Sequence, residues 1–134
     1  MQEHDLSGKL VSSWVTSISY VSFGSQQIID HKIIVPDPSL NHLVVYTPTG
    51  DLFKRIPCDF CIGKCVKMCI GGVNSVVVSV RDSNAVFKLN IEIGEVLWKY
   101  QVCKPRGVAC FKNRYILIYS YDDTTITIQD ADTG

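Results

Sequence analysis

Short apolar runs separated by turn-forming residues make up most of the chain. The clearest run is Val76-Val77-Val78, followed by Val80, a β-branched series that is typical of a strand buried on both faces. Gly, Pro and Asp interrupt the runs at strand-like intervals, and the apolar residues do not follow the 3.6-residue period of a helix. The pattern therefore predicts an all-β chain.

A glycine between two apolar runs recurs along the sequence. The glycines are Gly8, Gly50, Gly94 and Gly134, which lie 42, 44 and 40 residues apart. A period of 40–45 residues with four strands in each unit is that of a β-propeller blade. The spacing therefore predicts that the strands are organised as repeated blades.

Residues at fixed distances from these glycines also match. Three columns follow the glycine: Leu10, Leu52 and Val96 after two residues, Val11, Phe53 and Leu97 after three, and Trp14, Ile56 and Tyr100 after six. A fourth column, twelve or thirteen residues before the glycine, consists of Asp37, Asp82 and Asp122. We interpret these carboxylates as acceptors for backbone N–H groups in the turn between the second and third strands of a blade; binding of a ligand or cation is the alternative.

The columns set the expected strands and units. One unit would have strands at 65–70, 75–80, 85–91 and 95–100, and the next at 107–111, 115–121 and 124–129. The first would have an inner strand within 17–23, followed by 32–35 and 42–46. Residues 1–14 would end a preceding blade, and the repeat units would span about 15–56, 57–100 and 101–134. The predicted fold is a β-propeller fragment of about three four-stranded antiparallel blades, cut out of phase with the blade.

An arc of three blades does not close a ring, because closed propellers have about 4–8 blades. Its end sheets would expose apolar faces, which seek cover. We therefore expect either that the chain is a fragment of a longer propeller, which we favour, or that a second chain closes the ring.

Composition narrows the class of protein. The 134 residues are 46% hydrophobic and 19% charged, which is too apolar for a disordered chain. Thirteen basic residues balance thirteen acidic ones, so the broad positive field of nucleic-acid-binding proteins is missing. No apolar stretch approaches the ~20 residues needed to span a membrane, and residues 1–9 do not resemble a signal peptide. We expect a cytoplasmic protein without membrane contact.

Six cysteines offer the most distinct alternative chemistry. With no export signal we expect reduced thiols rather than disulfides. Cys58, Cys61, Cys65 and Cys69 fall within twelve residues and could bind zinc, or Cys58 and Cys61 could form a redox pair. We prefer core packing, because Cys65 and Cys69 would lie about 13 Å apart along one strand.

Catalytic motifs are missing from the sequence. His4, His31 and His42 are scattered, and no serine or cysteine stands in a recognisable nucleophile motif with a histidine. The glycines around Lys64 do not form a phosphate loop. We therefore expect no enzyme activity and no cofactor in this chain.

The segment 37–50, DPSLNHLVVYTPTG, resembles the repeat of NHL propellers, which are WD40-like in architecture. The segment 81–87, RDSNAVF, is similar to the same motif. The resemblance implies a propeller like those that end tripartite-motif proteins, where it would select substrates for a ubiquitin ligase whose catalytic domain lies outside this chain. Gly94 with Trp98 is also similar to the quinoprotein repeat, but the other units lack the tryptophan.

Propellers bind partners through loops at the rim, which rigid sheets hold in place. The loops after the second and fourth strands share one rim, where Arg81, Lys104, Arg106, Asp122 and Asp123 are the expected partner contacts. We predict a protein-recognition module, with an RNA-binding NHL propeller as the alternative. A quinoprotein-like propeller or a zinc-binding domain is the second alternative.

Overall fold

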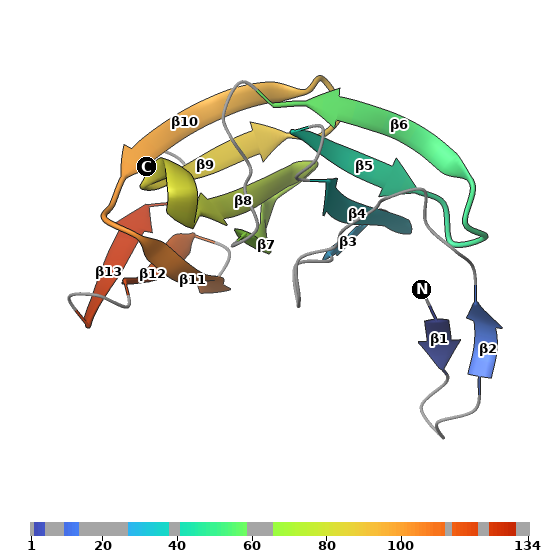
Figure 1. Cartoon of the computed structure of the whole chain (residues 1–134), viewed down its shortest axis with the longest axis horizontal. Helices are drawn as coiled ribbons and strands as arrows, with labels where there is room; N and C mark the ends of the chain where they lie inside the picture. The colour runs from blue at the N-terminus through green and yellow to red at the C-terminus, as the bar shows by residue number, and fades with distance from the viewer. Residues whose placement is uncertain are drawn as a thin grey trace.

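The computed structural model describes residues 2–4, 10–13, 27–37, 41–58, 66–111, 114–120 and 124–130 (Figure 1). Apart from one 3-10 turn, η1 (Arg81–Ser83), the elements in these ranges are strands, and all of them pair antiparallel. The predicted all-β class is therefore confirmed. No helix in this part of the chain is long and apolar enough to cross a membrane.

The strands form one hairpin and three larger sheets. The hairpin is β1 (Gln2–His4) and β2 (Leu10–Ser13). The first sheet contains β3 (Gln27–Ile29), β4 (Lys32–Asp37), β5 (His42–Tyr46) and β6 (Leu52–Pro57). The middle sheet contains β7 (Val66–Gly72), β8 (Ser75–Val80), β9 (Ala85–Asn90) and β10 (Glu95–Gln101). The third sheet contains β11 (Pro105–Phe111), β12 (Tyr115–Ser120) and β13 (Thr125–Asp130).

The three sheets stand side by side along an arc. Strands β6 and β10 lie on the outer side of the arc and β3 and β7 on its inner side (Figure 1). The innermost strand of the middle sheet, β7, contacts the first strands of the other two sheets, β3 and β11. Consecutive strands pair in order from the inside outward, as they do in the blades of a propeller. The structure thus confirms the prediction of about three blades of a β-propeller.

Alternation along the middle sheet explains how the blades stack. Successive side chains of a strand point to opposite faces. Val76 and Val78 of β8 therefore join a buried cluster with the first sheet, while Val77 joins a second cluster with Ile116 and Ile118 of the third sheet. Every residue of β8 is buried, as its β-branched run predicts.

The repeat also has a counterpart in the backbone. In each hairpin between a third and a fourth strand, the register shifts at one residue of the fourth strand: Val11, Phe53 and Leu97. These three residues form one of the columns found in the sequence, and each marks a β-bulge. Gly50 and Gly94 precede the bulges with φ of 92° and 77°, a conformation that favours glycine.

The inner strand of the first sheet differs from the prediction. It is β3, at Gln27–Ile29, rather than a strand within 17–23, which lies outside the described residues. β3 has only three residues, and its two isoleucines form a weaker pattern than the alternating polar and apolar residues of 17–23. The other predicted strands differ from the structure by a few residues at their ends.

The predicted equivalence of Asp37 with Asp82 in the turns between second and third strands was wrong. Asp37 pairs with His42 at the end of β4, where the middle and third sheets have Val80 and Ser120. Asp82 lies two residues further on, in η1, and Asp122 lies outside the described residues. The position that repeats in these turns is the last one, occupied by Asn41, Asn84 and Thr124, all with φ near +50°. A residue in the left-handed conformation reverses the chain there, and Asn adopts this conformation more readily than most other residues.

Candidate functional site

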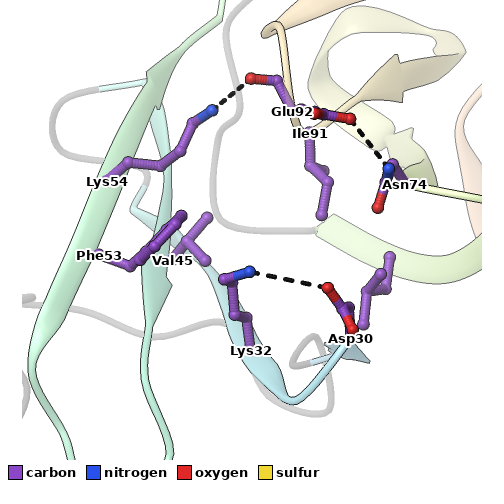
Figure 2. Close-up of a pocket in the computed structure, with 9 residues that line it drawn as sticks. Asp30, Lys32, Val45, Phe53, Lys54, Asn74, Ile91 and Glu92 are labelled. Carbon is purple, nitrogen blue, oxygen red and sulfur yellow. Dashed lines mark hydrogen bonds and ion pairs between the residues drawn. The ribbon is translucent and has the colours of Figure 1, made fainter.

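The site lies between the first and middle sheets, at the end opposite to the predicted rim. It is a cavity of about 280 Å³ into which both sheets contribute side chains (Figure 2). Its lining consists of Ile29, Asp30, Lys32, Val45, Phe53, Lys54, Asn74, Ile91 and Glu92. These residues come from strand ends and turns, so rigid sheets position loop-borne polar groups, as in many binding sites.

The floor of the cavity is apolar. Ile29, Val45 and Ile91 all belong to the buried cluster that joins the first and middle sheets. Because the floor is part of the core, its shape is fixed by packing on both sides. It can therefore receive an apolar group without rearranging the fold.

One wall combines an aromatic ring with an ammonium group. Lys32 Nζ lies 4.5 Å from the centroid of the Phe53 ring, within the range of a cation–π interaction, and 3.8 Å from Asp30 Oδ2. Phe53 is the bulge residue of β6, and bulges re-aim side chains. The ring is half exposed and lies beside Val45 and Lys32 at the cavity (Figure 2).

Glu92 organises the opposite wall. Asn74 Nδ2 donates a 3.0 Å hydrogen bond to Glu92 Oε2, and Lys54 Nζ donates a 2.6 Å bond to the Glu92 backbone oxygen (Figure 2). The Glu92 N–H in turn donates to Asn90 Oδ1 at 2.8 Å. The Lys54 bond joins the first sheet to the middle sheet across the cavity. The wall is thus held from both sheets.

The polar groups around the apolar floor balance in charge. Two ammonium groups, Lys32 and Lys54, stand with two carboxylates, Asp30 and Glu92. An ammonium group has three N–H donors, so each lysine can keep its contact and still bind a carbonyl or carboxylate oxygen. The arrangement suits a ligand that has both an apolar group and hydrogen-bonding groups of each kind.

The predicted partner residues lie at the other end of the sheets. Arg81 is in η1, Lys104 is in the β10–β11 loop, and Arg106 is exposed on β11. Asn84 brings the first two regions together: its N–H donates to Arg81 O at 3.1 Å, and its Oδ1 accepts from Lys104 N–H at 3.0 Å. Asp122 and Asp123 lie outside the described residues. This rim stays a predicted contact surface.

The structure separates two of the clustered cysteines. Cys58 packs against the cluster between the first and middle sheets, while Cys69 is buried in the cluster between the middle and third sheets. Burial raises the pKa of the Cys69 thiol to about 12, with a smaller contribution from Cys110, and a protonated thiol is a poor metal ligand. Cys61 and Cys65 lie outside the described residues. Within the described ranges, no three His, Cys, Asp or Glu side chains gather as a metal site.

Sequence reasoning missed the cavity because its lining is spread from residue 29 to residue 92. One signal was available. In the column of Val11, Phe53 and Leu97, Phe53 is the aromatic member, and the next residue is a lysine. An aromatic ring beside a cation at a bulge could have marked the position.

Comparison with known proteins places the fold. No family model and no curated protein matches the chain. A solved structure of a protein of unknown function from Bacteroides caccae is 13% identical, with a TM-score of 0.73 over 98% of this chain and 55% of that one. Virginiamycin B lyase from Staphylococcus aureus is 12% identical, with a TM-score of 0.64 over 95% of this chain and 47% of the lyase.

The WD40 β-propeller domain of Doa1 is 11% identical, with a TM-score of 0.51 over 78% of this chain and 39% of that one. The chain thus spans about half the length, or less, of the solved structures that it matches. At these identities the likeness concerns the fold alone. It shows that the chain has the architecture of part of a β-propeller.

Proposed function

We propose that the chain is a protein-recognition module and that it binds a peptide segment of its partner at the cavity between the first and middle sheets. The observation that carries this proposal is the apolar floor of the cavity, which is surrounded by Phe53 and by two lysines and two carboxylates that balance in charge. Sites of this kind combine apolar burial for affinity with a few polar groups for orientation.

A peptide offers the groups that the cavity can bind. One apolar side chain would fill the floor beside Ile29 and Ile91. Backbone carbonyls would accept hydrogen bonds from Lys32 and Lys54, and backbone N–H groups would donate to Asp30 and Glu92. The volume of about 280 Å³ suits a side chain or two rather than a large cofactor.

The resemblance to tripartite-motif propellers supports a finer proposal. In that setting the module would select substrates for a ubiquitin ligase whose catalytic part lies outside this chain. The rim of Arg81, Lys104 and Arg106 would then be a second contact region, at the opposite end of the sheets.

Peptide selection tests the proposed site. A phage-displayed random peptide library is selected against the 134-residue chain, and the affinity of an enriched peptide is measured by fluorescence anisotropy. We expect Lys32→Glu combined with Phe53→Ala to weaken binding by roughly tenfold or more, as loss of a hot spot does. Both side chains are at least partly exposed, so the fold should persist, which circular dichroism checks.

Lys104→Glu combined with Arg106→Ala is the matched control at the opposite end of the sheets. Like the cavity variant, it reverses the charge of one lysine and truncates one large side chain. The proposal predicts an unchanged affinity of this variant for a peptide bound at the cavity, because neither Lys104 nor Arg106 lines the cavity. It is overturned if no peptide is enriched, or if binding is lost in the control and kept in the cavity variant. A salt-dependent shift with single-stranded RNA that the control variant abolishes would instead favour the RNA-binding alternative.

A further inference from the structure

Two cysteines meet at the boundary between the middle and third sheets. Cys69 is on β7 and Cys110 on β11, the first strands of the two sheets, and these strands contact each other. Cys69 belongs to the buried cluster that the two sheets share, and Cys110 packs against it. Strand pairing places Cys69 beside Val77 and Cys110 beside Ile116, which both belong to this cluster. Because paired residues share a face of their sheet, the two thiols come from facing sides of neighbouring strands.

The titration of Cys69 also depends on Cys110. Burial, with a smaller contribution from Cys110, raises the pKa of the Cys69 thiol to about 12. The contribution from Cys110 requires the two sulfurs to lie near each other, because the interaction between charges weakens with distance. Two thiolates would be unfavourable in this apolar cluster, whereas a disulfide carries no charge. The surroundings therefore favour forms in which both sulfurs are neutral.

The other described cysteines are placed differently. Cys58 packs against the cluster on the opposite face of the middle sheet, so the sheet itself separates it from Cys69. Cys103 is exposed in the loop between β10 and β11. Among the cysteines in the described part of the chain, Cys110 is therefore the one that shares a cluster with Cys69.

We propose that Cys69 and Cys110 are a site of reversible oxidation, at which a low-molecular-weight disulfide such as oxidised glutathione introduces a disulfide between the middle and third sheets. A disulfide needs Cβ atoms that face each other on backbones that approach closely, and neighbouring inner strands provide both. The link would add a covalent bond to the apolar packing between the two sheets. Oxidation would thus control how firmly two blades are joined.

Thiol–disulfide exchange forms the link in two steps. Cys110 reacts first, because it is half-buried whereas Cys69 is buried. The Cys110 thiolate attacks one sulfur of oxidised glutathione, the S–S bond of the reagent breaks, and one glutathione leaves and takes up the proton that Cys110 released. Cys69 then gives up its proton and attacks the Cys110 sulfur, and the second glutathione leaves with that proton. Two protein thiols are oxidised, and one low-molecular-weight disulfide is reduced to two thiols.

Peptide mapping tests the link. The folded 134-residue chain is incubated with oxidised glutathione, its remaining thiols are blocked with N-ethylmaleimide in urea, and a tryptic digest without reductant is analysed by mass spectrometry. Cleavage after Lys and Arg, but not before Pro, places Cys69 in peptide 68–81, Cys110 in peptide 107–112 and Cys103 in peptide 100–106. We expect peptides 68–81 and 107–112 to be joined by a disulfide that a reductant cleaves.

Two alanine variants control the assignment. Cys110→Ala should leave Cys69 as a free thiol, whereas Cys103→Ala, which removes an exposed cysteine outside the cluster, should keep the link. The proposal is overturned if Cys69 of the unmodified chain stays a free thiol under conditions in which Cys103 carries glutathione. It is also overturned if Cys69 joins mainly a cysteine other than Cys110. Neither result depends on peptide binding at the cavity.

Discussion

At the scale of residues, asparagines in the left-handed conformation shape the turns of the blades. Asn41, Asn74 and Asn84 all have φ near +50°. Asn84 adds contacts on both sides: its N–H donates to Arg81 O, its carbonyl accepts from Val102 N–H at 3.1 Å, and its Oδ1 accepts from Lys104 N–H. One residue therefore closes the β8–β9 turn and ties it to the β10–β11 loop.

Replacement of Asn84 separates these two roles. Asn84→Gly keeps the backbone conformation and loses the side-chain bond to Lys104, so we expect the free energy of unfolding to fall by about 1 kcal/mol. Asn84→Ala loses the same bond and also places an alanine, which has no polar side chain to stabilise this conformation, in the left-handed region. The free energy of unfolding should therefore fall by about 1–2 kcal/mol more than in Asn84→Gly. Urea denaturation measures both values. Equal losses for the two variants would show that the backbone conformation is not the main constraint.

At the scale of elements, the hairpin between the third and fourth strands is the unit that repeats most faithfully. A glycine with positive φ is followed by a bulge in the first and middle sheets, at Gly50 with Phe53 and at Gly94 with Leu97. The bulge increases the local twist of the fourth strand. In the first sheet it also directs Phe53 to the candidate site.

Substitution of glycine tests this conformational requirement. Gly94 has φ of +77°, and an added Cβ would lie at contact distance from Ile56 Cγ2, 3.4 Å away, so Gly94→Ala should lower the free energy of unfolding by about 1–2 kcal/mol. Gly107→Ala is the matched control, because its φ is not in the left-handed region and its Cβ would lie 3.6 Å from Tyr119 Cβ. We expect a change within about 0.5 kcal/mol for the control. A larger loss in Gly107→Ala than in Gly94→Ala, by thermal or urea unfolding, would contradict the account.

Elements with a strong local pattern could be predicted from the sequence. β5 and β8 lie at the predicted residues, because a continuous β-branched or apolar run leaves no other conformation that buries it as well. β3 could not be predicted, because three residues carry little pattern and pairing with β4 defines the strand. The aspartate column failed because spacing from the glycine does not define a position in the turn before it: Asp37 is the last residue of β4, whereas Asp82 lies two residues after the end of β8.

The candidate site could not be predicted from local patterns in the sequence. Val45 and Ile91 are far apart in the sequence and meet because two sheets stack. The Lys54–Glu92 contact likewise joins different blades. Such contacts depend on the angle between sheets, and repeat spacing does not define that angle. The period showed that blades exist, and the structure showed which side chains face each other between them.

At the scale of the whole molecule, the middle sheet is the centre of the core. Its two faces belong to separate clusters, one shared with the first sheet and one with the third. The outward face of the third sheet continues the series without a cover in the described structure. Stacking of like sheets therefore accounts for the core, for the candidate site between two of them, and for the exposed face at one end.

Methyl–methyl nuclear Overhauser effects in a sample with labelled isoleucine, leucine and valine test this stacking most directly. The account predicts contacts from Val76 and Val78 to methyl groups of the first sheet, such as Ile34 and Leu43, and from Val77 to Ile116 and Ile118. Contacts from Val77 to the first sheet, or from Val76 and Val78 to the third, would contradict the arrangement of the blades.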